Sequence, residues 1–440
     1  MAGVTTETTP PDVLGELTWR GLIAQTTDLA ALRQSLAGGP VTLYGGFDPT
    51  APSLHIGNLV LLITLRHLQR AGHRVLCLVG GSTGLIGDPK PTAERNLNSP
   101  ELVAGWVLRL QHQIRPCLEF GGDNPATMVN NLDWTAGLSA LDFLRDIGKH
   151  FRVNVMIKKD AVAARLAGQD GISYTEFSYQ VLQGLDYLHL HREYGCTLQL
   201  GGADQWGNIL AGTDLIHRAE QVAVHAMTTP LITKADGTKF GKTEDGTVWL
   251  DRDLTSPYAF YQLWINVEDG SVIDYLKVFT GLGRAEIDAL AEATAAEPYR
   301  RAAQKTLAVE VTTLVHGAAA CAAVQQASEA LFGKGDLHSL DGQTLLDATA
   351  ELPGAEAEVG SSVIELLCAT GLARSRSEAR RSIEEGAVTL NQRRIADLEH
   401  RLVAEDFLHG SVAVLRRGRK AQAAARLAGA ARGRISSAAG

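Results

Sequence analysis

Short apolar runs alternate along the chain with longer segments in which apolar residues recur at helical spacing. The run from Val41 to Tyr44 predicts a buried strand, and the pattern from Leu59 to Leu68 predicts a helix. Glycines and prolines separate the two, and a second strand is predicted from Arg74 to Val79. A strand, a helix and a strand in this order favour an α/β fold with a parallel sheet and a Rossmann-like crevice at one edge.

Similar patterns extend over the first half of the chain. The expected helices are Leu17 to Ala37, Ser53 to Gly72 and Tyr174 to His189. A short strand is expected from Thr197 to Leu200, and the sheet is expected to close near Met227 to Ile232. The segment at about 125–200 would then interrupt the two halves of the nucleotide-binding fold.

The second half of the chain predicts helices from Pro257 to about Gly333 and a compact module that begins at Ser362. A chain of 440 residues is too long for one ordinary core, so two or three domains are expected. The expected parts are a catalytic domain at 15–235 with an inserted segment at about 125–200, a loop at 236–250, a helical domain at 251–340, a linker at 341–360, a small α+β domain at 361–425 and a basic tail at 426–440.

The composition, 45% hydrophobic and 20% charged, is typical of a soluble globular protein. No apolar run reaches the roughly 18 residues that a membrane helix needs. Residues 1–15 lack the basic and apolar regions of a signal peptide. The five cysteines form no C-x-x-C pair, which argues against a zinc site or a disulfide framework and fits the cytoplasm.

Charge is divided unevenly along the chain. The formal net charge is −8, but residues 361–440 carry +6 and the residues before them carry −14. A basic module attached to an acidic body indicates a protein that approaches a polyanion through one local surface.

Two motifs far apart in the sequence indicate a site for ATP. The segment from Tyr44 to Asn58 is a strand, a glycine- and proline-rich turn and the start of a helix, an arrangement that offers backbone N–H groups to a phosphate. Thr50 and His55 lie where they could contact such an anion. The later Lys239-Phe-Gly-Lys242-Thr243 adds two cations and a hydroxyl that could clamp a pyrophosphate. Either motif alone could be a purely structural turn.

Other polar positions surround the same predicted edge of the sheet. A glycine-rich turn at 80–89 precedes a loop with Lys90 and Arg95, which could equally be a solvated loop. Tyr179, Gln183 and Asp186 are spaced to share one helix face, although a polar face often points to solvent.

These motifs resemble those of class I aminoacyl-tRNA synthetases. Pro49 to Asn58 is similar to the HIGH motif, and Lys239 to Thr243 is similar to the KMSKS motif. The exact sequences of both motifs resemble those of bacterial tyrosyl-tRNA synthetases. The resemblance covers roughly residues 15–420. It departs at Asn58, where the family usually has His. Because Asn also donates hydrogen bonds, an altered ATP contact is expected there.

The resemblance implies a role for each matching residue. The residues implied in catalysis are Thr50, His55, Lys239, Lys242 and Thr243. Those implied in binding tyrosine are Tyr44, Asp88, Tyr179, Gln183, Asp186 and Gln205, with Gln199 as a neighbouring match. Those implied in binding ATP are Asp48, Gly57, Asn58, Arg95, Gly202, Asp204 and Lys242, although Asp204 could instead cap the next helix. The C-terminal module resembles a small ribosomal RNA-binding fold, in which Arg374, Arg376, Arg380 and Arg381 would contact tRNA.

By the same resemblance the expected function is tyrosine–tRNA ligation by a homodimer in the cytoplasm, with ATP and Mg²⁺ and with neither zinc nor a bound organic cofactor. The segment at about 125–165 would form much of the dimer interface. The main alternative is a tryptophanyl-tRNA ligase of the same architecture. Others are a different nucleotidyl transferase with a HIGH-type motif and an RNA-binding protein that has kept a synthetase body.

Overall fold

The computed structural model describes residues 12–90, 96–168, 171–233, 237–238, 240–243, 246–333, 335–418 and 421–429. The chain divides into two compact units. Unit 1 contains Met1–Leu250 and Glu268–Ala303, and unit 2 contains Asp251–Val267 and Gln304–Gly440. No helix in the described part of the chain is long and apolar enough to cross a membrane.

Unit 1 is built on a six-stranded sheet with the strand order β1-β6-β5-β2-β3-β4. Its strands are β1 (Gln25–Thr26), β2 (Thr42–Phe47), β3 (Arg74–Val79), β4 (Thr127–Asn130), β5 (Cys196–Gly202) and β6 (His225–Thr229). The edge strand β1 pairs antiparallel with β6, and the other neighbours are parallel. The predicted α/β fold with a parallel sheet is therefore confirmed.

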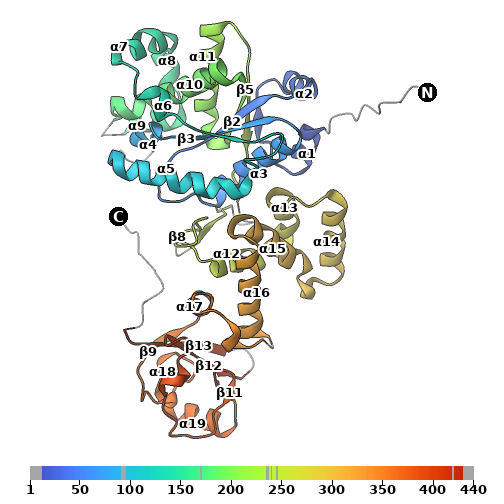
Figure 1. Cartoon of the computed structure of the whole chain (residues 1–440), viewed down its shortest axis with the longest axis vertical. Helices are drawn as coiled ribbons and strands as arrows, with labels where there is room; N and C mark the ends of the chain where they lie inside the picture. Colours follow the sequence, from blue (N-terminus) through green and yellow to red (C-terminus); the bar gives the residue numbers. More distant parts are fainter. Residues whose placement is uncertain are drawn as a thin grey trace, which may run out of the picture. The chain divides into compact units, whose positions relative to one another are not determined.

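Helices cover both faces of this sheet. Since parallel crossovers are right-handed and the chain moves in opposite directions from β2 to β3 and from β5 to β6, α3 (Ile56–Arg70) and α11 (Trp206–Glu220) lie on opposite faces. Figure 1 shows α3 with α5 (Pro100–Ile114) below the strands, and α10 (Tyr174–Tyr194) with α11 above them. The direction of winding reverses between β2 and β5, where ligands bind in folds of this kind.

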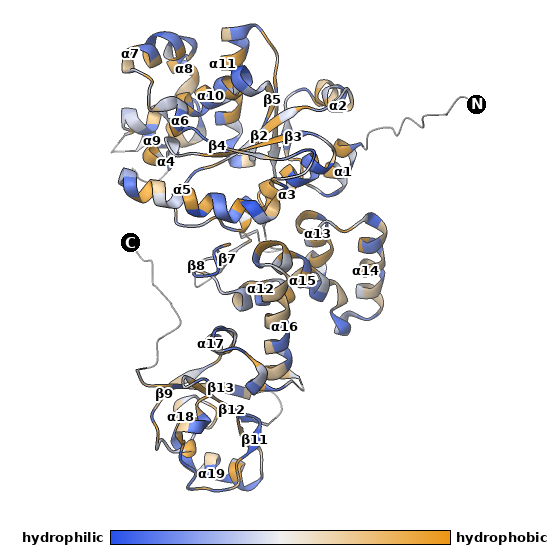
Figure 2. Ribbon diagram, viewed as in Figure 1, coloured by the Kyte–Doolittle hydropathy of each residue, from blue (hydrophilic) through white to orange (hydrophobic). Residues whose placement is uncertain are grey.

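The core of unit 1 lies along the central strands. Almost every residue of β2 and β3 is buried, and Figure 2 colours most of β3 as hydrophobic. Helix α3 is buried on most sides because it packs between the sheet, α1 (Val13–Trp19) and α13 (Asp269–Phe279). Every residue from Leu59 to Leu65 is buried, which reflects the central place of this helix.

The remaining helices of unit 1 are short or peripheral. The helices are α2 (Leu29–Ala37), α4 (Thr83–Ile86), α6 (Leu132–Thr135), α7 (Ala140–Asp142), α8 (Val153–Met156), α9 (Asp160–Ala167) and α14 (Arg284–Ala296). A π-helical turn at Phe143–Ile147 and single 3-10 turns at Arg115–Cys117, Gly148–His150, Ala203–Gln205 and Pro298–Arg300 connect them.

The single helix expected at Leu17 to Ala37 is wrong. The chain leaves α1 through Gly21, whose φ of 71° ends the helix, and then forms β1. A separate helix, α2, begins after its N-cap residue Asp28, whose carboxylate accepts hydrogen bonds from the backbone N–H groups of Ala30 and Ala31. Local capping chemistry therefore overrides the apolar spacing that suggested one helix.

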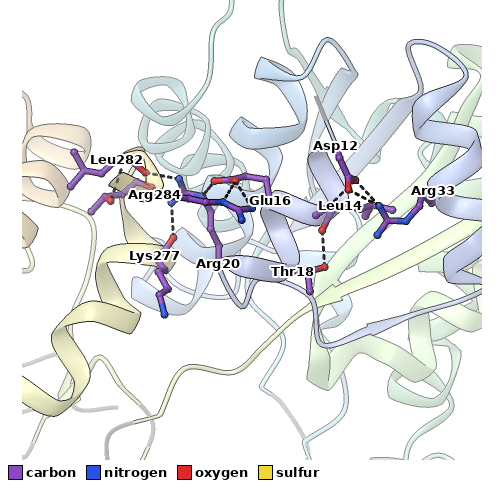
Figure 3. Close-up of polar contacts among 11 residues, drawn as sticks. Asp12, Leu14, Glu16, Thr18, Arg20, Arg33, Lys277, Leu282 and Arg284 are labelled. Carbon is purple, nitrogen blue, oxygen red and sulfur yellow. Dashed lines mark hydrogen bonds and ion pairs between the residues drawn. The ribbon is translucent and has the colours of Figure 1, made fainter. Parts of the chain in front are cut away.

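Arg20 joins the first helix of unit 1 to its last ones (Figure 3). Its guanidinium is buried and donates to the carbonyl groups of Lys277, Thr280 and Leu282 at 2.6–2.9 Å, and it pairs with Glu16. Arg284 pairs with the same Glu16 at 3.1 Å. The helical segment at 268–303 thus belongs to the nucleotide-binding unit, whereas the sequence suggested one helical domain at 251–340.

Unit 2 contains the other helices and a second sheet. Its helices are α12 (Pro257–Ile265), most of α15 (Ala302–His316), α16 (Ala318–Phe332), a 3-10 turn at Leu337–Ser339 and α17 (Gly342–Ala350). The expected linker at 341–360 is not a linker, because it contains α17 and the strand β9 (Gly354–Ala357). The Asp341 carboxylate caps α17 by accepting the backbone N–H of Thr344.

The C-terminal sheet has five strands in the order β11-β10-β12-β13-β9. The strands after β9 are β10 (Val388–Leu390), β11 (Arg393–Arg394), β12 (Val412–Arg417) and β13 (Ala421–Leu427). Two helices, α18 (Val363–Ala369) and α19 (Arg376–Glu384), and a 3-10 turn at Ala404–Asp406 complete the module. One apolar cluster that includes Val363, Leu367, Ile383 and Leu415 forms its core, so this is the small α+β module that the sequence predicts.

Candidate active site

Several predicted site residues that the structure describes lie on or just after β2 and β5, which are neighbours in the sheet. Tyr44 of β2 and Gln199 of β5 are partners in the parallel register. Asp48 and Thr50 follow β2, while Asp204 and Gln205 follow β5. These positions come from different parts of the sequence and meet because parallel strands end at one edge.

One side of the site is a hydrogen-bonded set around Asp48. The Tyr179 hydroxyl donates to Asp48 Oδ2 (2.5 Å), and the Thr83 hydroxyl donates to Asp48 Oδ1 (2.6 Å). A Cβ on Gly80 would lie 2.1 Å from Thr83 Oγ1 and 2.2 Å from Asp48 Oδ1. The glycine-rich turn therefore has no side chain here because these polar groups fill the space. Burial and then the Asp48 carboxylate raise the pKa of Tyr179, so its hydroxyl stays protonated.

Asp88 organises a second polar group. Its two oxygens accept hydrogen bonds from Gln205 Nε2 (3.0 Å) and Asn208 Nδ2 (3.1 Å). The Lys159 ammonium donates to Asn208 Oδ1 at 2.8 Å. Burial lowers the pKa of Lys159 to about 8, although the Asp88 carboxylate opposes this shift. Asp48 and Asp88 together make this end of the site suitable for an ammonium group.

Asp186 lies at the other end of the site and is 1% exposed. One oxygen accepts from Asn131 Nδ2 (3.0 Å) and the other from Trp134 Nε1 (3.0 Å). Burial raises the pKa of the Asp186 carboxyl to about 8, and the two hydrogen bonds oppose that rise. Trp134 in turn stacks on the ring of His189, with 4.3 Å between ring centroids. The carboxyl group is thus held in place by two donors.

Three buried polar atoms around this site have no hydrogen-bond partner among the described residues. They are the Tyr44 hydroxyl oxygen, Gln183 Oε1 and Gln199 Oε1. Burial, and then the neighbouring Asp186, raise the pKa of Tyr44, which therefore remains a neutral donor. Because a buried polar group without a partner is costly, such a cluster indicates a place where a polar ligand binds.

The first turn of α3 carries the residues of the HIGH-type motif. His55 is the N-cap of the helix, and its backbone N–H donates to Asn58 Oδ1 at 3.0 Å. The side-chain oxygen of Asn58 therefore caps the helix, a contact that the sequence did not suggest. A Cβ on Gly57 would lie 2.8 Å from Cε1 of His55. Thr50, His55 and Gly57 are exposed at this end of the helix, as a phosphate site requires.

The chain after the KMSKS-type motif comes back to the same turn. Leu250 N–H donates to the Leu54 carbonyl at 2.8 Å, and Trp249 forms an antiparallel bridge with His55. The motif enters the short hairpin of β7 (Lys242–Thr243) and β8 (Gly246–Thr247). Arg95, Lys239 and the side chains of Lys242 and Thr243 lie outside the described residues. The two motifs are nonetheless adjacent through their backbones.

The side chain of Asp204 is exposed just after β5. A Cβ on Gly202 would lie 2.5 Å from Asp204 Oδ1, so this carboxylate folds back over the end of β5. Gln205, rather than Asp204, is the N-cap residue of α11. The exposed Asp204 carboxylate is therefore not the cap of this helix.

Five residues of these networks were missing from the sequence interpretation as site residues. They are Thr83, Asn131, Trp134, Lys159 and Asn208. Thr83 lies inside the glycine-rich turn at 80–89 that the sequence analysis singled out, and Asn208 lies three residues after Gln205. Asn131 and Trp134 carry no local signal, since their role depends on a helix more than 40 residues later. In the described part of the chain, no group of three or more metal-binding side chains forms a site for a metal ion.

The predicted RNA-contacting arginines lie on or beside α19 in unit 2, and all four side chains are exposed. Ser375 caps this helix by accepting the backbone N–H of Glu378. Three of the arginines pair with acids: Arg376 with Glu365 (2.8 Å), Arg380 with Glu399 (3.3 Å) and Arg381 with Glu385 (3.9 Å). Exposed pairs of this kind contribute little, so they compete only weakly with a phosphate.

A parallel sheet with an exposed helix end and a cluster of buried polar groups at the switch point is typical of nucleotide-binding enzymes of the class I synthetase type. Residues 36–333 match the family model described as tRNA synthetases class I (W and Y), and residues 345–424 match the tyrosine–tRNA ligase SYY-like C-terminal domain. The chain therefore belongs to the class I tRNA synthetases for tryptophan and tyrosine.

Individual relatives give a more specific match than the family model does. A tyrosine–tRNA ligase of Streptomyces coelicolor is 58% identical over 420 residues, which is 95% of this chain and 100% of the relative. One of Mycobacterium bovis is 54% identical over 413 residues, which is 93% of this chain and 97% of the relative.

Among solved structures, a C-terminally truncated mitochondrial tyrosyl-tRNA synthetase of Aspergillus nidulans has a TM-score of 0.67 and 30% identity. The match covers 74% of this chain and 96% of that structure. A tryptophanyl-tRNA synthetase of Encephalitozoon cuniculi, with a TM-score of 0.53, 14% identity and coverage of 70% and 87%, shares the fold alone.

Proposed function

We infer that the protein is a tyrosine–tRNA ligase that activates L-tyrosine with ATP and transfers the tyrosyl group to tRNA(Tyr). The observation that carries this inference is the pair of neighbouring buried groups Tyr44 and Asp186, each 1% exposed. Asp186 is held by two donors, and the Tyr44 hydroxyl has no partner among the described residues. A phenol that donates to Asp186 and accepts from Tyr44 would satisfy both groups.

The opposite end of the pocket suits the rest of the amino acid. Asp88 and the Tyr179 hydroxyl, with Gln183, would hold the α-ammonium group. Tyr179 already donates to Asp48, so its oxygen can accept from an ammonium while the carboxylates supply the opposite charge. Gln205, which donates to Asp88, orients that carboxylate. The carboxylate of the bound tyrosine then faces the helix end that carries His55.

Activation needs no nucleophile from the protein. The tyrosine carboxylate attacks the α-phosphorus of ATP, a bond to the bridging oxygen breaks, and tyrosyl-adenylate and pyrophosphate form. Thr50 and His55 would hydrogen-bond the phosphates, and Lys239, Lys242 and Thr243 would stabilise the charge that develops on pyrophosphate. Arg95 would add a further cation from its loop. Mg²⁺ would arrive with ATP as its counter-ion.

ATP would lie across the two strand–turn–helix units. Asp48, Gly57 and Asn58 of the first unit, and Gly202 and Asp204 of the second, would line the nucleotide. A Cβ on Gly57 would clash with the His55 ring at 2.8 Å, which explains why the first turn of α3 has glycine there. The exposed Asp204 carboxylate is a suitable acceptor for ribose hydroxyls.

The basic C-terminal module would hold tRNA(Tyr) while its terminal adenosine receives the tyrosyl group. The exposed arginines on α19 support this role, since phosphate contacts position a nucleic acid without reading its sequence. The tryptophanyl alternative is not favoured, because an indole has no hydroxyl for the Tyr44 and Asp186 pair.

A comparison of amino acids in ATP–pyrophosphate exchange tests the function directly. Tyrosine should support exchange and tryptophan should not. In Tyr44→Phe, the kcat/KM for tyrosine should fall by a factor that corresponds to about 1–2 kcal/mol, the scale of one hydrogen bond. The kcat/KM for phenylalanine should be unaffected. An unchanged tyrosine-to-phenylalanine ratio in this variant would remove Tyr44 from the pocket.

We also propose that the protein is a cytoplasmic homodimer. Large apolar side chains are exposed in the segment expected to form the interface, including Leu141 (78%), Leu144 (52%) and Val153 (61%). Two-fold symmetry would bury such a patch against its own copy. All five cysteines are free thiols, which supports a reducing compartment.

Light scattering at micromolar concentration tests the assembly. A mass of about twice the 47.0 kDa of one chain is expected. Leu141→Asp should lower that mass, because a charge in the interface would have to be buried. An active species with the mass of a single chain would overturn the dimer.

A further inference from the structure

Phe240 is a buried residue within the KMSKS-type motif. Its side chain is 9% exposed, whereas the preceding Gly237 and Thr238 are exposed. The Phe240 ring packs against two aromatic residues of α13, with centroid distances of 4.5 Å to Tyr275 and 6.1 Å to Phe279. The motif is therefore held through an apolar side chain that lies between its two lysines in the sequence.

Tyr275 of α13 contacts the chain both before and within the motif. Its hydroxyl donates to the Thr233 carbonyl at 3.2 Å, ahead of the motif. The Phe240 N–H donates to the Ile232 carbonyl at 2.9 Å, which joins the motif to the residue before Thr233. Tyr275 therefore holds the chain at Thr233 through its hydroxyl and at Phe240 through its ring.

The residue after Phe240 connects this anchor to the HIGH-type motif. Gly241 has a φ of 83°, and a Cβ there would lie 3.1 Å from Cβ of Ile56, the first residue of α3. Its carbonyl accepts the N–H of Val248 at 2.8 Å. Strand β7 starts at the next residue, Lys242. The two residues before Lys242 are thus held in place, Phe240 by its ring contacts and Gly241 by its packing on α3.

The anchor itself is firmly attached to the nucleotide-binding fold. Helix α13 packs on α3, and the end of α13 is held by the buried Arg20 through the carbonyl groups of Lys277 and Thr280 (Figure 3). The contacts of Phe240 with Tyr275 and Phe279 are between aromatic rings, so this part of the attachment uses no charged group.

We propose that Tyr275 and Phe279 are positioning residues of the activation step, which hold Phe240 and thereby fix the place of β7 and Lys242. The inference rests on the role proposed above for Lys242 in stabilising pyrophosphate. A displacement of about 1 Å at a catalytic group can reduce the rate of a reaction about 100-fold. Loss of the anchor should therefore slow adenylate formation without altering the tyrosine pocket.

Four variants separate positioning from general stability. Tyr275→Ala removes the ring and the hydroxyl, and Tyr275→Phe removes only the bond to Thr233. Thr280→Val is the matched control, because it removes a buried hydroxyl that donates to the Leu276 carbonyl (2.6 Å) at the end of the same helix. Phe240→Leu is a second route to the same loss should Tyr275→Ala fail to fold.

The measurements are the single-turnover rate of tyrosyl-adenylate formation, the equilibrium affinity for tyrosine and the thermal midpoint. In Tyr275→Ala or Phe240→Leu we expect a rate lower by about 10- to 100-fold and a tyrosine affinity within about twofold of the parent. Tyr275→Phe should lose less, and Thr280→Val should keep the rate. An unchanged rate in both Tyr275→Ala and Phe240→Leu, or an equal loss in Thr280→Val, would overturn the proposal.

A double variant tests whether the anchor acts through Lys242. If it does, Tyr275→Ala should slow the reaction much less in a Lys242→Ala background than in the parent protein. Fully multiplicative losses would overturn the proposal. If Lys242→Ala formed the adenylate at the parent rate, both the proposed role of Lys242 and this inference would be wrong. If Lys242→Ala were slow and Tyr275→Ala kept the parent rate, only the positioning role of Tyr275 would be wrong.

Discussion

Asp186 shows how a single carboxyl group can be both buried and ready to bind. Asn131 and Trp134 each donate to one of its oxygens. A carboxylate oxygen accepts more than one hydrogen bond, so capacity remains for a phenol. Burial raises its pKa to about 8, and the nearby Asp48 contributes to the rise. The ionised form of Asp186 is therefore unfavourable in the free protein, and a hydroxyl donor would stabilise it.

This shift predicts a pH dependence of stability. The carboxyl has a pKa of about 8 in the folded protein and an ordinary value of 3.8 when unfolded, so the folded state binds the extra proton between these values. Its contribution to stability is complete below pH 3.8 and is lost as the pH rises through about 8. The loss is at most about 1.4 kcal/mol per pH unit.

Asp186→Asn removes this proton and keeps the shape of the side chain. The thermal midpoint of the ligand-free parent should therefore fall more steeply between pH 5.5 and 8 than that of Asp186→Asn. The comparison concerns slopes, because the amide has one acceptor fewer and lowers the midpoint at every pH. Parallel slopes would mean that Asp186 is already ionised throughout this range.

Sequence alone could predict the residues that share one element. Tyr179, Gln183 and Asp186 lie on α10, as their spacing suggests. It could not predict Thr83, which connects Asp48 to Asn131 by hydrogen bonds of 2.6 and 3.0 Å. That link joins the segments that follow β2, β3 and β4, and only the pairing of these strands brings the segments together.

At the scale of elements, the first turn of α3 is where the two motifs meet. The His55 ring occupies the space over Gly57, and Trp249 of the returning chain pairs with His55. The lack of a side chain at position 57 is therefore a requirement of the ring and not of the helix.

Gly57→Ala separates these two requirements. Alanine favours a helix over glycine by roughly 0.5–1 kcal/mol, so the variant should be as stable as the parent or slightly more stable. Its Cβ would lie 2.8 Å from Cε1 of His55, so the ring must move. We expect about a tenfold loss in the rate of adenylate formation, measured in a single turnover. A variant with the parent rate would show that the ring position is not critical.

Elements with strong periodicity were predictable and those set by caps were not. Arg74–Val79 is a strand as predicted, because its apolar run has no competing signal. The region at 341–360 was interpreted as a linker from its proline, glycine and acids. In the structure, Asp341 caps α17 and Gly354 begins β9, which pairs with β13. The partner strand is about 70 residues away, so no local pattern could reveal it.

For the whole molecule, the boundary of the basic module matters to any truncation. A cut near residue 360 would leave β9 without its partner β13, as an unpaired edge that promotes aggregation. A cut after Leu352 removes the complete sheet and retains α17, which packs on α12 and α16. The shorter chain ending at Leu352 is therefore the proper test of what the module does.

We expect this truncated chain to keep tyrosine-dependent ATP–pyrophosphate exchange and to charge tRNA poorly. Charging by the full chain should also fall more steeply with added salt, because residues 361–440 carry +6 and release counter-ions from RNA. Equal tRNA affinity and equal salt slopes in the two proteins would exclude the module as an RNA contact.

The parallel pairing of β9 with β13 also has a consequence for protein synthesis. Gly354 of β9 pairs with Ala424 of β13. The first strand of this sheet to be synthesised therefore cannot pair until the last strand has been synthesised. While the ribosome is still producing α18, α19 and β10, β9 has no neighbour on either side. The nucleotide-binding unit can fold long before that time, because its last described segment ends near residue 303. A nascent chain should therefore acquire protease resistance in two stages, the second only after Leu427 has left the exit tunnel.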